Sequence, residues 1–222
     1  MTEAPAPMRI PIVTKLLLIG CVLIFMLQSM DRTGWLLWHL ALWPLGMPSV
    51  GSYGEALPQF MPWQLLSYGF LHGGLFHLAF NLFGLYSFGS TLERYLGSTA
   101  FLTLYLSSIV GAGLTQLVVA TAAVQDGDLY PTVGASGGVF GVLLAFAMLF
   151  PKARVMLLIP PIPMPAWVMV ILFVVIELTL GVTGTASGIA HFAHLGGMAT
   201  GFLLLQYWRG KLPIQPKRIL RG

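Results

Sequence analysis

Long stretches without any charged side chain are the feature that most limits how this chain can fold. Six of them take up most of the sequence, at residues 16–30, 56–92, 95–125, 129–151, 155–176 and 178–208. A helix needs about 20 predominantly apolar residues to cross the hydrocarbon core of a bilayer. Five stretches are long enough, and the first reaches this length with residues 10–13, because Lys15 can extend its long side chain to the interface.

The composition excludes a soluble domain of this size. Of the 222 residues, 57% are hydrophobic and 8% are charged, which leaves too little polar surface to cover an apolar core in water. We therefore expect an all-α membrane protein, a bundle of six transmembrane helices in one domain over residues 10–208. The expected helices cover residues 10–30, 73–92, 98–120, 135–150, 163–182 and 189–208.

The first apolar stretch has a second interpretation, because its basic flank and short apolar core also fit a signal peptide. The residues that follow, Gln28 to Asp31, lack a small-x-small cleavage pattern. We favour a membrane anchor. Cys21, within this stretch, is the only cysteine of the chain, which excludes an intramolecular disulfide and a cysteine-based metal site.

The basic residues fall on one side of the expected bundle. With six spans both termini share a side, and that side holds Arg9, Lys15, Arg94, Lys152, Arg154, Arg209, Lys211, Lys217, Arg218 and Arg221. The other side holds only Arg32. The positive-inside rule then places a short N-terminal segment (1–9) and a basic tail (209–222) in the cytoplasm. This topology explains the net charge of +4 and requires no nucleic-acid partner.

The segment between the first two expected helices, residues 31–72, is long and rich in aromatic side chains. It contains Trp35, Trp38, Trp43, Phe60 and Trp63 among prolines and glycines. Tryptophan favours the boundary between membrane and water. We expect this loop to be membrane-associated and to lie partly in the outer leaflet, although a simple aromatic belt explains the same pattern.

Polar side chains inside membrane segments are costly and usually functional. Here they fall near the outer ends of the expected helices: His72, His77, Asn81, Ser136, Glu177, His191 and His194. Their convergence predicts one water-accessible site near the outer face.

Ser136 begins the expected helix 135–150, where a serine commonly caps free backbone N–H groups. Gly134 and Gly137 on either side leave its hydroxyl uncovered and allow unusual backbone torsions. Free N–H groups at a helix start can also stabilise a developing negative charge. Serine with such donors is one half of an acyl-transfer site.

The other half is a base, and His194 is the candidate. His194, Gly197 and Gly201 share one helix face, and the two glycines form a small-xxx-small seam like that of Gly137 and Gly141. Two such seams would bring the helices close enough for His194 to meet Ser136. His77 and Asn81, at i and i+4, could supply oxyanion donors or a simple interhelical hydrogen bond.

Three segments resemble the patterns of rhomboid intramembrane serine proteases: HxxxxHxxxN at residues 72–81, GxSG at 134–137 and AHxxGxxxG at 193–201. They occur in the expected order and on the expected helices. The resemblance implies the six-helix rhomboid fold and a Ser–His dyad that needs no cofactor. It makes Ser136 the nucleophile and His194 the general base.

Further roles follow from the same resemblance. It implies an oxyanion hole made by His77, Asn81 and the N–H of Ser136, and structural roles for His72 and Glu93. Gly134, Gly137 and Gly197 are supporting residues. Phe140 stands where many members have a tyrosine that stacks on the catalytic imidazole, and Gln64 stands where many have an arginine in the first loop.

Two residues near the expected dyad have no assigned part in it. His191 lies on roughly the same face as His194, but only His194 has glycines at +3 and +7. The aspartates lie in loops, which leaves Glu177 as the only acid within an expected helix. It could orient a histidine or bond to loop backbone, and we favour a structural role.

The expected function is cleavage of peptide bonds in or next to transmembrane helices of membrane-protein substrates, in a bacterial inner membrane, with the site open to the outer side. One alternative is a catalytically silent relative that binds membrane clients, although such relatives lack the serine or the histidine. Another is a histidine-lined metal or proton transporter. A soluble hydrolase with GxSxG is a third, opposed by the apolar helical runs.

Overall fold

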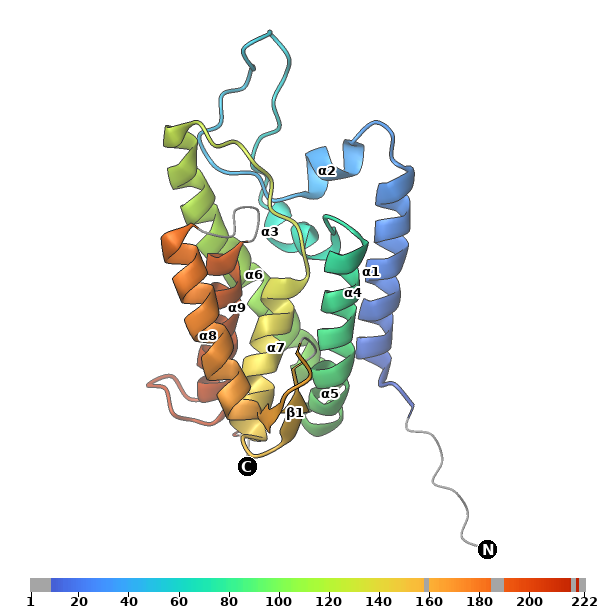
Figure 1. The fold of residues 1–222 in the computed structure, drawn as a ribbon, viewed down its shortest axis with the longest axis vertical. Helices are drawn as coiled ribbons and strands as arrows, with labels where there is room; N and C mark the ends of the chain where they lie inside the picture. Colours follow the sequence, from blue (N-terminus) through green and yellow to red (C-terminus); the bar gives the residue numbers. More distant parts are fainter. Residues whose placement is uncertain (1–8, 158–159, 185–189, 217–218, 220–222) are drawn as a thin grey trace, which may run out of the picture.

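The computed structural model describes residues 9–157, 160–184, 190–216 and 219, and most of them are helical. The helices run up and down in a bundle that carries its largest loop at the upper end (Figure 1). The elements in chain order are α1 (Ile12–Met30), α2 (Trp35–Leu40), α3 (Gln64–Ser67), η1 (Tyr68–Phe70), α4 (Leu75–Gly84), η2 (Leu85–Gly89), α5 (Ser90–Leu96), α6 (Ser98–Ala123), η3 (Val124–Asp126), α7 (Ser136–Leu149), β1 (Arg154–Met156), β2 (Pro163–Pro165), α8 (Ala166–Thr183) and α9 (His191–Trp208).

Within the described residues, three helices are long and apolar enough to cross a membrane by length and composition. They are Ile12–Met30, Ser98–Asp126 and Ala166–Thr183, and Ser136–Leu149 is a shorter apolar helix. The other two expected spans have recognisable reasons for falling outside this group. A π-helical turn, η2, interrupts the helical run from α4 to α5, and α9 contains three glycines and two histidines.

Two helix boundaries differ from the sequence prediction for physical reasons. The second expected helix does not end at residue 92 but continues through α5 to Leu96, since Gly97 with φ = +84° is the residue that turns the chain. The fifth does not begin at Pro163. Pro163–Pro165 forms β2, which pairs antiparallel with β1, and α8 starts at Ala166. Residue 189, the expected start of the last helix, lies outside the described residues.

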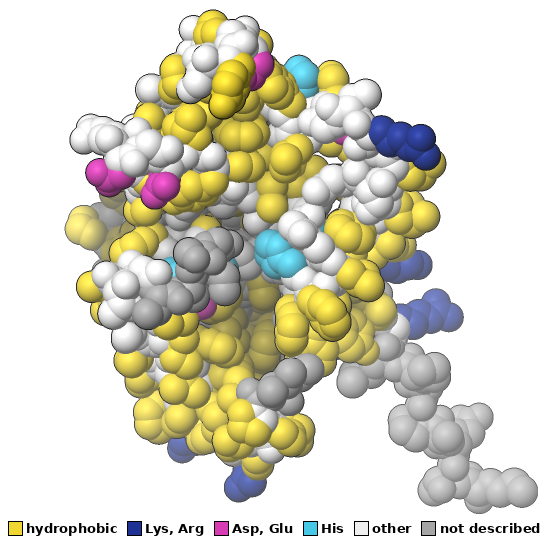
Figure 2. All heavy atoms as spheres, turned by 45° about the horizontal axis from the view of Figure 1, so that its top comes forward, with side chains coloured by type: hydrophobic (Ala, Val, Ile, Leu, Met, Phe, Trp, Pro, Cys, Tyr) yellow, Lys and Arg dark blue, Asp and Glu magenta, His cyan; other side chains and the backbone are white. Residues whose placement is uncertain are grey.

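Helix α6 is the centre of the bundle. It packs against α9, α7, α5, α3 and α1, and its Phe101, Leu104, Tyr105 and Ile109 are completely buried. By contrast, α1 and α8 expose most of their apolar side chains. Figure 2 shows hydrophobic side chains over much of the visible surface, with the few lysine and arginine side chains at its edges. The apolar exterior is that of a protein solvated by lipid.

The loop between α1 and α4 contains short helices, α2 and α3, that we did not predict. Gln64 is buried and holds this loop together through its amide. Its Oε1 accepts the N–H groups of Trp43 (3.3 Å) and Met61 (3.2 Å), and its Nε2 donates to the carbonyls of His39 (3.4 Å) and Gln59 (3.3 Å). Gln64 therefore ties together four places in the loop without a charge.

The start of the loop is held by Asp31. Its carboxylate accepts the hydroxyl (2.6 Å) and N–H (3.0 Å) of Thr33 and the N–H of Leu36 (2.7 Å). The Thr33 hydroxyl and the Leu36 N–H hold the pKa of Asp31 below its ordinary value. Trp35 and Trp63 remain more than half exposed, which agrees with a loop that contacts lipid.

Glu93 on α5 caps the start of α1 from a distance of about 80 residues along the chain. Its carboxylate accepts the N–H groups of Val13 (2.9 Å) and Thr14 (2.7 Å), the Thr14 hydroxyl (2.8 Å) and the Ser98 hydroxyl (2.7 Å). The first N–H groups of a helix have no partner within it, and α1 has no side-chain cap of its own. This carboxylate fixes α1 to the α5–α6 turn.

We expect Glu93→Gln to lower the free energy of unfolding by about 2–3 kcal/mol, because an amide cannot accept all four hydrogen bonds and its NH₂ would face other donors. Equilibrium unfolding in mixed detergent micelles measures this difference. Ser98→Ala, which removes one of the four bonds, should cost about 1 kcal/mol. Equal stability of Glu93→Gln and wild type would contradict the capping role.

Candidate functional site

Ser136 and His194 face each other where α7 and α9 begin. The hydroxyl oxygen of Ser136, the first residue of α7, lies 2.8 Å from Nε2 of His194 in the first turn of α9. Within the described residues, the one side-chain hydrogen bond of Ser136 is to this imidazole, so the hydroxyl is directed to His194 and not to the backbone. This is the arrangement of a nucleophile and its base.

The glycines of the two helices allow this contact. A Cβ placed on Gly197 would collide with the backbone carbonyl of Gly137, and one on Gly201 would meet the carbonyl oxygen of Gly141 at 2.9 Å. Backbone therefore lies against backbone along the α7–α9 seam, as the small-xxx-small spacing predicts. Any side chain at Gly197 would push α9 away from α7 and His194 away from Ser136.

Gly134 shapes the turn that leads into Ser136. Its φ of +133° is one that residues with a side chain rarely adopt, and a Cβ there would lie 2.8 Å from Nε2 of His77. The first backbone N–H of α7 that donates an i→i−4 hydrogen bond is that of Val139, which donates to the Ala135 carbonyl. The N–H of Ser136 is left facing the start of the helix, where a developing anion would be stabilised.

The ring of Phe140 covers one face of the His194 imidazole. The two rings are nearly parallel, 8° apart, with centroids separated by 4.3 Å. Phe173 of α8 contacts the Phe140 ring edge-on at 5.7 Å. Phenylalanine thus provides the stacking surface that the family resemblance assigned to this position, and the ring is held by a second aromatic contact.

His77 on α4 presents one ring nitrogen to the site. The N–H of Gly73 donates to His77 Nδ1 (3.4 Å), so the neutral ring carries its proton on Nε2. That nitrogen lies beside Gly134, and His77 itself is half-buried. Asn81 is buried one turn further along α4, where its Nδ2 donates to the His77 carbonyl (2.9 Å) and retains a second N–H. Both side chains keep a donor that could serve an oxyanion.

Glu177 lies between two histidines, a position that the sequence spacing did not predict. Its Oε2 is 2.6 Å from Nδ1 of His191 and 2.9 Å from Nδ1 of His194. All three side chains are buried. The acid was apparent in the sequence as the only one within an expected helix, but nothing in its position identified the histidines it would meet.

The same three residues have the donor types of a metal centre, and one ligand atom from each lies within 4.8 Å of the others. In a tetrahedral zinc site the zinc–ligand distances are about 2.0–2.1 Å, which places the ligand atoms about 3.3 Å from one another. The carboxylate oxygen lies closer than that to both nitrogens. The spacing is that of groups that share protons.

His72 has contacts that match a structural role. Its N–H donates to Gln28 Oε1 (3.1 Å), and Gln28 Nε2 donates to its carbonyl (2.9 Å), which joins the start of α4 to the end of α1. Its buried ring meets the His77 ring edge-on at 5.3 Å. His72 therefore supports the position of His77.

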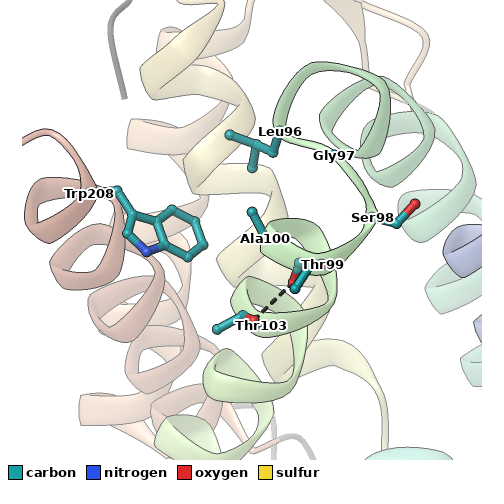
Figure 3. A pocket seen from close by; sticks show the side chains of 7 residues that line it. All are labelled: Leu96, Gly97, Ser98, Thr99, Ala100, Thr103 and Trp208. Atoms are coloured by element: carbon teal, nitrogen blue, oxygen red, sulfur yellow. Dashed lines mark hydrogen bonds between the residues drawn. The ribbon is translucent and has the colours of Figure 1, made fainter. Parts of the chain in front are cut away.

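A hollow at the other end of the bundle has no such chemistry. Figure 3 shows its lining at the α5–α6 turn and the end of α9: Leu96, Gly97, Ser98, Thr99, Ala100, Thr103 and Trp208. Among the described residues, no histidine or acid lines it. The candidate site residues described above come instead from α4, α7, α8 and α9.

Known proteins match this chain over most of its length. The rhomboid domain family matches residues 59–210. Rhomboid protein 1, mitochondrial, of Saccharomyces cerevisiae is 33% identical over 166 residues, which cover 72% of this chain and 45% of the yeast protein. Rhomboid protease GluP of Bacillus subtilis is 34% identical over 140 residues, 63% of this chain and 25% of that protein.

A human protein gives a third comparison. Presenilin-associated rhomboid-like protein, mitochondrial, is 29% identical over 150 residues, which cover 65% of this chain and 39% of the human protein. The chain thus spans less than half the length of each of these three relatives.

Proposed function

The chain belongs to the rhomboid family, and we propose that it is an intramembrane serine endopeptidase. The observation that carries the proposal is the 2.8 Å contact between Ser136 Oγ and His194 Nε2, made between two helices within an apolar bundle. The two residues lie 58 positions apart in the chain, and packing of the two helices does not require a hydrogen bond between them. They form the pair that acyl transfer requires.

Acylation begins when Ser136 Oγ attacks the carbonyl carbon of the scissile peptide bond and its proton passes to His194 Nε2. The C–N bond then breaks, and His194 returns that proton to the leaving amine. Water attacks the resulting ester, with His194 again taking and giving one proton, so that Ser136 regains its hydroxyl. The Phe140 ring keeps the imidazole plane fixed during these transfers.

The tetrahedral intermediate carries a negative oxygen that needs donors. The N–H of Ser136, the Nε2–H of His77 and the remaining N–H of Asn81 supply them in this proposal. The Gly73 contact that sets the tautomer of His77 supports its part. Asn81 would act from one turn further into the membrane.

We place the protein in a membrane through six spans, with residues 10–208 as one protease domain. The helical run from α4 to α5, α7 and α9 would join the three longer apolar helices as spans. Helix α1 begins and α9 ends at the lower end of Figure 1, so the segments 1–9 and 209–222 would both be cytoplasmic. The site at the upper ends of α7 and α9 would open to the outer side, in a bacterial inner membrane.

The substrates in this proposal are transmembrane helices of other proteins. A helix hides its peptide carbonyls in i→i−4 hydrogen bonds, so the scissile segment must unwind, which favours small or helix-weakening residues. Helix α8 is the lateral wall that such a segment would pass. It packs against α7 and α9 only in part, and its Val175 and Val182 are more than half exposed. The exposed tryptophans of the first loop would anchor it in the outer leaflet.

The test uses purified protein in lipid vesicles, treated with a fluorophosphonate and assayed on a model transmembrane substrate. We expect a covalent adduct on Ser136, mapped by mass spectrometry, and cleavage that a chelator leaves unchanged. Cleavage lost with the chelator would contradict the proposal in favour of metal chemistry. Absence of both adduct and cleavage would contradict it in favour of a client-binding protein.

A further inference from the structure

The carboxylate of Glu177 has the position that a third member of a catalytic triad would take. It approaches His194 from the Nδ1 side, while Ser136 lies on the Nε2 side of the same ring. In a triad the carboxylate holds the imidazole with its proton on Nδ1, so that Nε2 is free to accept the proton of the nucleophile. The distances to the two ring nitrogens, 2.9 Å and 2.8 Å, fit this division of roles.

Helix α8 brings Glu177 next to His194 because α8 lies close to the start of α9 at Gly181. A Cβ on Gly181, one turn after Glu177, would lie 3.1 Å from the Phe192 ring and 3.3 Å from the His191 Cβ. Around it, Val175 and Leu178 are at least half exposed, whereas Glu177 is 7% exposed. A carboxylate turned inward from an otherwise lipid-facing helix is costly and is expected to be functional.

His191 holds the other side of the carboxylate. Its Nδ1–H donates to Glu177 Oε2 at 2.6 Å, while the same oxygen lies 2.9 Å from the Nδ1 of His194 but not along its N–H direction. Catalytic hydrogen bonds in a ligand-free site are often poorly aligned and tighten when substrate binds. His191 therefore keeps the oxygen in place for a small rotation of the His194 ring within the plane that Phe140 fixes.

We propose that Glu177 is a positioning residue for His194, which extends the Ser–His pair to a Ser136–His194–Glu177 arrangement with His191 as its anchor. The inference rests on the proposed protease function. The Nδ1 proton stays on His194 throughout the reaction, and Glu177 stays ionised. When Nε2 receives the proton of Ser136, the carboxylate balances the positive charge of the imidazolium.

The experiment compares wild type with Glu177→Gln and Glu177→Asp, and with Thr179→Val as an exposed control on the same helix. We expect Glu177→Gln to lower kcat by about 10²-fold or more, up to the about 10⁴-fold lost when a triad carboxylate is replaced by an amide, with KM changed less than about twofold, because the contact acts in the transition state and not in binding. Glu177→Asp should recover part of kcat. Thr179→Val should match wild type.

A second readout separates positioning from a merely structural role. The ¹⁵N shifts of labelled histidines, assigned with His194→Gln, should show the Nδ1–H tautomer of His194 in wild type and a mixture in Glu177→Gln. Unchanged kcat and an unchanged tautomer in Glu177→Gln would overturn the inference. A chelator that slows wild type but not Glu177→Gln would also overturn it, because the carboxylate would then act through a bound cation.

The tautomer measurement needs no substrate. If wild type neither reacts with the fluorophosphonate nor cleaves any substrate, the protease proposal fails. A Glu177-dependent tautomer of His194 would then still support the contact, whereas a tautomer independent of Glu177 would reject it. The two failures are therefore distinguishable.

Discussion

Ser136→Ala is expected to lower the rate of transmembrane-substrate cleavage by about 10⁴-fold or more, below detection in most assays, because it removes the atom that forms the acyl-enzyme. His194→Ala should have a similar effect, since the one hydrogen bond of Ser136 Oγ within the described residues is to that ring. The double variant should be no slower than either single one, because residues that act as a unit are not additive. Cleavage in vesicles, measured over many hours, provides the comparison.

The control for this prediction is His191→Ala. His191 lies on the same side of α9, three residues earlier, and contacts Glu177 but is not hydrogen-bonded to Ser136. We expect it to retain cleavage with a loss of about 10-fold, the smaller end of the range known for partners one step removed from a reacting group. Complete loss in His191→Ala together with activity in His194→Ala would mean that the base has been misassigned.

Gly197→Ala is expected to abolish most cleavage without touching any reactive group. The new Cβ would collide with the backbone of Gly137, so that α9 must shift by about an ångström, and a displacement of that size in a catalytic contact can cost about 10²-fold in rate. Overpacking of this kind also lowers the free energy of unfolding by about 1–3 kcal/mol. Cleavage and equilibrium unfolding in micelles are measured on the same preparation.

Gly20→Ala is the matched control for this variant. Gly20 lies in α1, where a Cβ would have no heavy atom within 4 Å. Alanine there should leave cleavage unchanged and stability equal or slightly higher, because alanine favours helix more than glycine does. If Gly197→Ala behaved like Gly20→Ala, the close α7–α9 seam would not exist in solution.

The sequence predicted the helices well because their signals are local. Charge-free runs located α1, α6 and α8 within a few residues, and the family suggested by three short motifs is confirmed by the match over residues 59–210. The errors lie where a local signal was overridden. Pro163–Pro165 forms β2 and pairs with β1, which begins nine residues earlier. The second expected helix continues past Glu93 because backbone N–H groups at the start of α1 donate hydrogen bonds to the Glu93 carboxylate.

The sequence also indicated which faces would meet, but not every partner. Glycines at i and i+4 predict close contact between α7 and α9, because a helix face without side chains lets another backbone approach closely and make van der Waals contacts. The same reasoning placed Ser136 and His194 at the top of that contact, where they lie 2.8 Å apart. Helical periodicity was sufficient here, since both residues belong to the seam itself.

The hydrogen-bond partners of three polar residues could be identified only from the tertiary structure: those of Glu177, Gln64 and Glu93. Each is a polar side chain whose partners come from other elements: two histidines of α9, four places in the first loop, and the start of α1. Helical spacing tells which residues share a face, but the residue that the face meets depends on how far and at what angle two helices dock. Local sequence signals therefore predicted the apolar helices α1, α6 and α8, the family and the contact between Ser136 and His194. The buried carboxylate beside His194 follows instead from the way α8 docks on α9.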